Sequence, residues 1–384
     1  MRSIQVLGTV AGLLLGGSIF SMPSFADRIA EKVMEQPKLE VVAELEQRPA
    51  NIAVTFDGRI IVSLHPFDKP STKMIVINKD GTTEPFPDAE WNREGGPDSH
   101  SIGFSNVMGV RASTRGSVFV LDLGDENFAP RVIEFDVLRR RLVGMRYIPR
   151  NFTTAQSFLQ DFAINWDNNH LYIADMGQAD LSKPAQPAVI DLDMTNGIMY
   201  RILGDHPSVQ PPETPLEIYG KVLTFEKDGR DVPVRAALNS ITLDIMQDNL
   251  YYAPMGEGKL YRVPLSKMSD VSVSEDAVIK RIEIVGDKPA SDGITVDAEE
   301  NVYITAIGKN EIGVIDKSGH YRPYLQDERL QWADGLSFGP DGYIYVTISR
   351  LHEHPFFNHG AEPAEKKPYL IARFKPIAEG GIGR

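Results

Sequence analysis

The sequence predicts an all-β protein, a six-bladed β-propeller closed by an N-terminal strand in its last blade. One strand–turn–strand pattern recurs six times along the 384 residues. The recurrences lie 42 to 79 residues apart, which is the length of a four-stranded blade with variable loops. One apolar segment near the N-terminus is left without a partner. With 42% hydrophobic and 24% charged residues, the composition is that of an ordinary globular protein.

Each recurrence contains an apolar strand, a turn rich in Asp, Asn or Gly, and a second apolar strand. The six copies span residues 50–64, 106–122, 160–175, 239–254, 290–308 and 332–350. The centres of their second strands are Ile61, Phe119, Tyr172, Tyr251, Tyr303 and Tyr345. The outer two strands of a blade are expected after each copy, as in "KMIVIN" and "TTEPF" of blade one.

The last unit supplies only three strands of its own, in "GLSF", "YIYVTIS" and "YLIARFK". We predict that "KLEVVAELE" (38–46) is its fourth strand. Such closure removes a free sheet edge and ties the two ends of the chain together. The chain contains no cysteine, so a disulfide cannot serve as this lock.

The propeller domain is expected to span residues 27–384, with a long insertion at about 178–236. Within the insertion, "KVLTFEKDGRDVPV" predicts a hairpin around Asp228 and Gly229. The insertion is either a surface excursion or a flap over the central channel. The segment "DRIAEKVMEQ" (27–36) has the pattern of one short helix.

Residues 1–26 have the features of a signal peptide. A basic start at Arg2 is followed by an apolar run from Ile4 to Phe20, and small residues precede a cleavage site after Ala26. A retained anchor is the alternative, but the run is short for a membrane span and no basic stop follows it. We therefore expect a secreted or periplasmic protein with no stable membrane anchor after cleavage.

The charge and the motifs exclude several classes of function. A formal net charge of −13 disfavours nucleic acid as a partner. The absence of cysteine excludes a thiolate zinc site, a cysteine nucleophile and a lipoprotein anchor. The chain has no "GxSxG" element, phosphate-binding loop or dinucleotide fingerprint. A small molecule is the expected partner, and a monomer is favoured.

Polar residues recur at one offset and predict a ring at the channel mouth. Four of them lie eleven residues before the strand centres of blades three to six: Asp161, Ser240, Asp292 and Asp334. Asn239 is adjacent, and Asn51 and Asn106 are slightly displaced in blades one and two. Either each Asp caps a local turn, or the ring holds a ligand or a cation. The candidate ligands of a divalent cation at this ring, Ca²⁺, are Asp161, Asn239, Asp292 and Asp334.

Loops after the second strands are expected on the same face and would form a pocket wall. The wall residues that we predict are Asp122, Asp125, Asp175, Asn310, Arg350 and His352. The segment "HEHPFFNH" places His352, His354 and His359 close together. A transition-metal site there is one reading, but Pro355 and the polar tail favour a loop whose histidines bind no metal.

Four segments together resemble the major royal jelly protein and Yellow family: "VMGVRASTRGSVFVLDLG", "LQDFAINWDNNHLYIADMG", "SITLDIMQDNLYYAPMGEGKLYRVPLSKM" and "WADGLSFGPDGYIYVTISRL". They follow the family's order and cover nearly the whole mature chain. The resemblance implies a six-bladed, often secreted propeller. Some relatives bind biogenic amines in the channel, insect members are linked to pigmentation, and bacterial members are described as L-dopachrome tautomerase-related.

A weaker resemblance is to the gluconolactonase and senescence-marker group. Those propellers hold a divalent cation with a Glu from blade one and with Asn and Asp from other blades. The corresponding segment here, "RPANIAV", contains no Glu, which argues against the same metal site.

Two functions follow from these patterns. In the first, the protein is an enzyme, tautomerase-like or lactonase-like, with Asp292, Asp334, Asp161 and His352 as acid and base candidates. In the second, it is a periplasmic protein that binds a small molecule, of the amine type, without chemistry. The two readings differ in whether turnover depends on the channel carboxylates.

Overall fold

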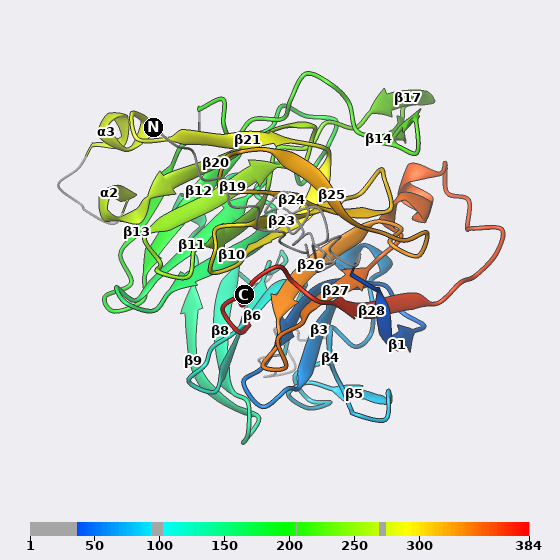
Figure 1. The fold of residues 1–384 in the computed structure, drawn as a ribbon, viewed down its shortest axis with the longest axis horizontal. Helices are drawn as coiled ribbons and strands as arrows, with labels where there is room; N and C mark the ends of the chain where they lie inside the picture. Colours follow the sequence, from blue (N-terminus) through cyan, green and yellow to red (C-terminus); the bar gives the residue numbers. More distant parts are fainter. Residues whose placement is uncertain (1–36, 94–102, 127, 205, 269–273, 384) are drawn as a thin grey trace, which may run out of the picture. The chain divides into compact units, whose positions relative to one another are not determined.

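The computed structural model describes residues 37–93, 103–126, 128–204, 206–268 and 274–383 (Figure 1). The chain divides into residues 1–36 and residues 37–384, and the second unit contains the whole fold described below. The predicted signal peptide and the predicted helix at 27–36 lie outside the described residues. Within the described part of the chain, no helix is long and apolar enough to cross a membrane.

Six four-stranded antiparallel sheets confirm the propeller. Blade one contains β2 (Pro49–Val54), β3 (Ile60–Leu64), β4 (Met74–Ile77) and β5 (Thr83–Pro85). Blade two contains β6 (Val107–Ala112), β7 (Ser117–Asp122), β8 (Arg131–Asp136) and β9 (Arg141–Tyr147). Blade three contains β10 (Leu159–Asn165), β11 (His170–Asp175), β12 (Ala188–Asp193) and β13 (Met199–Ile202).

The second half of the ring repeats this order. Blade four contains β18 (Leu238–Leu243), β19 (Asn249–Pro254), β20 (Gly258–Pro264) and β21 (Glu283–Lys288). Blade five contains β22 (Ser291–Val296), β23 (Val302–Ala306), β24 (Glu311–Ile315) and β25 (Tyr321–Gln326). Blade six contains β26 (Ala333–Phe338), β27 (Ile344–Ile348), β28 (Tyr369–Phe374) and β1 (Glu40–Leu45).

The closing strand is where the sequence predicts it. Strand β1 pairs antiparallel with β28, so blade six combines the first described strand with three strands from the other end of the chain. Each first strand also contacts the first strands of both neighbouring blades, and these contacts run round the whole ring. The first strands are almost entirely buried because they line the centre, whereas outer strands such as β9 are largely exposed.

The insertion contributes two small hairpins. They pair β14 (Glu217–Ile218) with β15 (Lys221–Val222), and β16 (Thr224–Lys227) with β17 (Arg230–Pro233). The second hairpin turns at Asp228 and Gly229, as the sequence predicts. Strands β12 and β13 also lie within the range 178–236. They pair as the outer strands of blade three, so this part of the range belongs to the blade and not to the insertion.

Helices are few and short in the described residues. The α-helices are α2 (Leu265–Met268) and α3 (Glu275–Ile279). The 3₁₀ helices are η1 (Pro66–Asp68), η2 (Arg150–Phe152), η3 (Leu351–Glu353) and η4 (Pro355–Phe357). Three of these, η1, η3 and η4, belong to the loops that follow second strands of blades.

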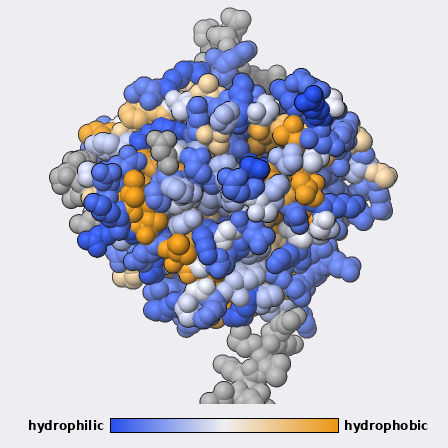
Figure 2. Space-filling view, turned by 90° about the horizontal axis from the view of Figure 1, so that it is seen from above, coloured by the Kyte–Doolittle hydropathy of each residue, from blue (hydrophilic) through white to orange (hydrophobic). Residues whose placement is uncertain are grey.

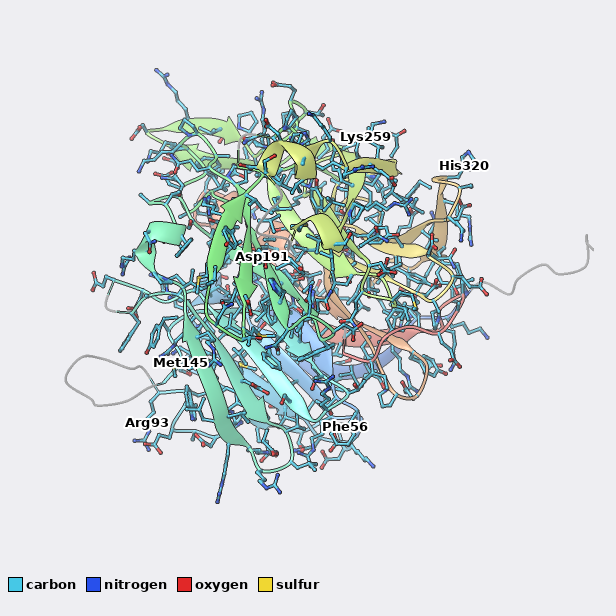
Figure 3. The ribbon with its side chains drawn as sticks, turned by 90° about the vertical axis from the view of Figure 1, so that its left-hand side faces the viewer. Phe56, Arg93, Met145, Asp191, Lys259 and His320 are labelled. Atoms are coloured by element: carbon cyan, nitrogen blue, oxygen red, sulfur yellow. The ribbon has the colours of Figure 1, made fainter. Side chains whose placement is uncertain are left out.

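The surface is mostly polar, but some charged side chains lie inside the blades. Figure 2 shows a mostly hydrophilic surface on which hydrophobic groups form separate patches. In Figure 3, Asp191 of β12 lies among the strands, whereas Lys259 and His320 lie near the periphery. Asp191 is buried, and its carboxylate bonds the His170 ring, with 2.6 Å between Oδ1 and Nδ1. The interior therefore accepts charged groups where they have partners.

Candidate functional site

A β-bulge near the start of each first strand builds the predicted ring. In every blade the pairing register between first and second strand shifts at this point. The bulges place one residue per blade around an enclosed space of about 10 Å³, the channel cavity: Asn51, Met108, Gln160, Asn239, Asp292 and Asp334. Because a bulged residue leaves the strand ladder, its side chain can turn toward the channel. Arg111 and Asp161 also line the channel cavity.

The repeated Asp–Gly pair of blades five and six follows from this geometry. A Cβ atom at Gly293 would lie 2.1 Å from the backbone oxygen of Asp334, and one at Gly335 would lie 3.0 Å from the Cα atom of Asn51. Glycine therefore lets adjacent blades approach closely at the bulge. Thr305 and Thr347 of the second strands accept hydrogen bonds from these glycine N–H groups, at 2.8 and 2.9 Å.

One side of the channel cavity is an ion pair that the sequence reading missed. Arg111 of β6 donates from Nη1 to Oδ1 of Asn51 at 3.0 Å and from Nη2 to Oδ2 of Asp161. The amide of Asn51 also donates to Oδ1 of Asp161 at 3.2 Å. Burial raises the pKa of Asp161 to about 6, although Arg111 opposes that shift. A charged residue inside the buried strand "VMGVRA" was the signal available in the sequence.

The other side of the channel cavity is a pair of carboxyl groups. Asp292 accepts from Nδ2 of Asn239 at 2.6 Å and from Nε1 of Trp332 at 2.7 Å. Its carboxyl group is also hydrogen-bonded to that of Asp334, which requires a proton between them. Burial raises the pKa of both groups, and the charge of Asp292 raises that of Asp334 further. These shifts favour a proton shared between the two carboxyl groups.

The channel residues do not fit the predicted Ca²⁺ site. Calcium takes six to eight oxygen ligands. Here the guanidinium of Arg111 and N–H groups of Asn51, Asn239 and Trp332 already engage the oxygens of Asp161 and Asp292. Across the described residues, no group of three or more His, Cys, Asp or Glu side chains could hold a metal ion. The charge of Asp161 has a partner within the protein.

A much larger space, the aromatic pocket, shares Gln160 with the channel cavity. Its volume is about 700 Å³, which is within the usual range for small-molecule sites. Loops that follow the second strands of several blades line it, together with the β16–β17 hairpin. Its walls include Phe67, Phe158, Met176, Met255, Phe225 and Phe356. Phe225 stacks on Phe356 with ring centroids 5.4 Å apart, so the insertion forms part of the pocket wall.

Trp332 and Gln160 form the boundary between the two spaces. Trp332 lines the aromatic pocket and is only 1% exposed, while its indole N–H bonds Asp292 of the channel cavity. Its backbone has a φ of 53°, a left-handed conformation that is strained for a side chain of this size. Gln160 lines both spaces. Sequence reasoning missed both residues because each opens a copy of the repeated pattern but has no charge to mark it as part of a site.

The histidines of the aromatic pocket are held by protein partners. Nδ1 of His65 accepts from the N–H of Phe67, and Nδ1 of His354 accepts from that of Phe356. Nε2 of His354 lies 3.2 Å from Asp68. Burial lowers the pKa of His65 to about 3, so this ring is neutral at pH 7. The side chain of Gln178 is also engaged, because both of its polar atoms bond backbone groups.

Two predicted wall residues lie inside the blades rather than on the pocket. Asp122 is fully buried, 2.9 Å from Arg131, and accepts from the N–H of Asn106. Asp175 is equally buried in blade three and bonds Arg201 and the N–H of Phe158. Both carboxylates end a second strand and fix the loop that follows it.

The remaining predicted residues are dispersed. Asn106 and Asp125 line a separate cavity of about 320 Å³. Asn310 accepts from the hydroxyl of Tyr219 at 2.5 Å. Ser240 is buried, and its hydroxyl has no hydrogen-bond partner among the described residues. Arg350 lines a polar cavity of about 410 Å³ and bonds Glu353 at 2.6 Å.

His352 lies behind the aromatic pocket. Its ring stacks on that of Trp332, with centroids 6.1 Å apart and an interplanar angle of 11°. Burial lowers its pKa to about 4, so it is neutral at pH 7. His352 therefore supports the indole that bounds the pocket, and it does not line the pocket itself.

Comparison with solved structures identifies the fold but no activity. A gluconolactonase from Xanthomonas campestris aligns with a TM-score of 0.53 and 11% identity, over 88% of this chain and 89% of that one. A luciferin-regenerating enzyme aligns at 0.54 and 10% identity, over 90% and 98%. An inactive virginiamycin B lyase from Staphylococcus aureus, solved with quinupristin, aligns at 0.50 and 12% identity, over 89% and 100%.

Sequence comparison gives the family. No curated protein sequence matches the chain. The sequence pattern of the major royal jelly proteins matches residues 113–360, from blade two to the loop after β27. That range contains most of the residues around the channel cavity and much of the aromatic pocket. The chain belongs to the major royal jelly protein family.

Proposed function

We propose that this protein binds a small aromatic molecule in the aromatic pocket and releases it unchanged. The observation that carries the proposal is the separation of the two spaces. The pocket of about 700 Å³ is walled by aromatic rings and thioethers, whereas the carboxyl groups lie in a channel cavity of about 10 Å³. Ring faces and polarisable sulfur atoms favour contact with another flat ring.

The second reading, an enzyme, has less support from this geometry. None of Asp161, Asp292, Asp334 and His352 lines the aromatic pocket. A general acid or base must come within hydrogen-bond reach of the proton that it transfers. Both oxygens of Asp292 already accept N–H bonds, and Trp332 lies between this residue and the pocket. Tautomerase or lactonase chemistry would require Trp332 or Gln160 to move aside.

Calorimetric titration with 3-ethylindole tests the proposal, because this probe has an aromatic ring and no polar tail. We expect saturable one-to-one binding with a negative heat-capacity change, the sign of apolar surface leaving water. Chromatography of the mixture after incubation should return the probe intact. Consumption of an indole in a reaction that Asp334→Asn abolishes would instead establish the enzyme.

The predicted export of the chain completes the proposal. Cleavage after Ala26 would place the pocket in the periplasm or outside the cell, where a binding protein meets small molecules from the surroundings. Fractionation of cells that express the full chain, followed by N-terminal sequencing, tests this. A mature protein beginning at Asp27 is the expected result.

A further inference from the structure

We infer that Gln160 determines the specificity of the aromatic pocket, and that it selects ligands whose innermost group is an uncharged hydrogen-bonding group such as an amide. This inference rests on the proposed binding function and adds the chemical class of the ligand. It arises from the one bulge residue that lines both the aromatic pocket and the channel cavity.

The backbone explains why Gln160 is available to a ligand. In the pairing of β10 with β11, Leu159 lies opposite Asp175 and Asp161 lies opposite Ala174. Gln160 is therefore the extra residue of the bulge and has no cross-strand partner. Bulges commonly redirect a side chain beside a binding site. Here the redirected side chain reaches the boundary between the two spaces.

The side-chain oxygen of Gln160 is unpartnered. Its Oε1 atom is buried and has no hydrogen bond within the described part of the chain. Gln178, on the same pocket, shows the contrast, because its Oε1 and Nε2 both bond backbone groups. A buried acceptor without a partner is costly and uncommon in folded proteins. A ligand group that bonds Gln160 would remove that cost.

The charges beneath Gln160 favour a neutral ligand group. Arg111 is paired with Asp161, and the Asp292 carboxylate beside Asp334 accepts N–H bonds from Asn239 and Trp332. A carboxylate entering here would meet the carboxyl groups of this Asp pair, and an ammonium group would lose its hydration while the oxygens of Asp161 and Asp292 already have partners. An amide has both a donor and an acceptor, so a ligand amide or hydroxyl can satisfy it without adding charge.

The charges at the rim of the aromatic pocket do not change this preference for an uncharged ligand group. Its lining includes Lys69 and Lys227 together with Asp180 and Glu226, which gives two groups of each sign. Lys69, Glu226 and Lys227 are exposed, so solvent screens their charges. The closer walls are apolar, among them Phe158 and Met176. A ligand ring would lie against those walls with its polar group toward Gln160.

A series of four indoles that share one ring tests the inference: 3-ethylindole, indole-3-acetamide, tryptamine and indole-3-acetate. Calorimetry on the full chain should show indole-3-acetamide binding about tenfold more tightly than 3-ethylindole, the gain expected from one buried hydrogen bond. Tryptamine and indole-3-acetate should bind no more tightly than 3-ethylindole.

Two variants test the contribution of the Gln160 side-chain amide to binding. Gln160→Leu should weaken indole-3-acetamide about tenfold and leave 3-ethylindole unchanged. Gln160→Met, whose side chain is unbranched and of similar length, should behave in the same way and replaces the leucine variant if that one fails to fold. Gln331→Leu is the control, because Gln331 is also partly buried but does not line the pocket.

The outcomes separate this inference from the proposed function. Binding of 3-ethylindole with no preference for the amide, or an amide preference that survives in both Gln160 variants, would overturn the inference and leave the aromatic binding site intact. Tightest binding of tryptamine would also overturn it. If none of the four indoles binds, the proposed function itself fails.

Discussion

The chemistry of single residues in the channel is set by their immediate partners. Asp161 and Asp334 occupy the same offset in the sequence pattern. Asp161 lies against a guanidinium, whereas Asp334 lies against another carboxyl group. One is an anion with a counter-ion, and the other has its pKa raised by burial and by a neighbouring carboxyl group. Burial alone cannot produce this difference, because both side chains are buried.

Substitution of Asp334 by Asn should change how stability depends on pH. The pKa of Asp334 is raised above its ordinary value of 3.8, so the folded protein binds this proton more tightly than the unfolded chain does. The stabilisation is therefore fully present below that ordinary value and is lost as pH rises toward the folded pKa. In Asp334→Asn, an amide N–H replaces the shared proton at every pH.

We expect the unfolding free energy of the variant to exceed that of the wild type by a margin that grows with pH. One proton contributes at most about 1.4 kcal/mol per pH unit. Urea denaturation at a series of pH values between about 5 and 8 measures the margin. The control variant Asp248→Asn, at an exposed position, should show no difference from the wild type that grows with pH. A margin that shrinks as pH rises would contradict the shared proton.

The sequence predicted the convergence of these residues but not their partners. A constant offset from the strand centres was enough to place Asp161, Asp292 and Asp334 around one channel. Asn106 is displaced from that offset, which in blade two falls on Met108, and Met108 lines the channel cavity instead. The pairing of Asp161 with Arg111 links two blades, and a pattern that repeats along the chain carries no information on which side chains meet across it.

At the scale of elements, the β16–β17 hairpin supplies part of the wall of the aromatic pocket. The hairpin packs through Phe225 on Phe356 of η4, which belongs to the loop after β27. The sequence predicted the hairpin from its Asp-Gly turn and left open whether it covers the channel. The choice depends on contacts between segments more than a hundred residues apart, and a local turn motif cannot supply them.

Two phenylalanine substitutions should separate binding from stability. Phe225→Ala removes a pocket wall, and we expect it to weaken 3-ethylindole binding by about tenfold, the equivalent of one lost aromatic contact. Phe338→Ala removes a core ring that is 1% exposed and packs near Tyr303, so it should lower the unfolding free energy by about 3–5 kcal/mol.

Calorimetry and urea denaturation on both variants make the comparison. Phe225→Ala should destabilise the protein less than Phe338→Ala does, because the hairpin lies outside the six blades. Equal loss of stability, with binding retained in Phe225→Ala, would show that the hairpin belongs to the core and not to the pocket wall.

At the scale of the whole propeller, both ends of the described chain close the ring. Strand β1 completes blade six, as the sequence predicted. Residues 377–383 form a second closure that the sequence did not reveal, because this tail has no strand pattern of its own. Gly380 and Ile382 of the tail form β-bridges with Asp297 and Phe338. These two partners lie where the first strands of blades five and six end, at the opposite end from the bulges. The tail therefore crosses the far end of the channel.

Removal of residues 377–384 should destabilise the propeller as a whole. The tail links three blades through backbone hydrogen bonds: the N–H of Ala298 to the oxygen of Glu379 at 2.8 Å, the N–H of Gly383 to that of Phe338 at 2.9 Å, and the N–H of Ala112 to that of Gly383 at 3.2 Å. The N–H of Ile377 also donates to the buried hydroxyl of Tyr303 at 2.6 Å. At about 1 kcal/mol for each bond, the expected loss of unfolding free energy is about 4 kcal/mol.

Urea denaturation of the truncated chain measures that loss, and removal of Arg384 alone, which leaves all four bonds in place, is the control. Because the tail joins blades two, five and six rather than two neighbouring strands, the whole ring should unfold at lower urea in one transition. An unchanged midpoint would mean that β1 alone closes the ring. A separate early transition confined to blade six would mean that the tail stabilises its own blade and does not link it to the others.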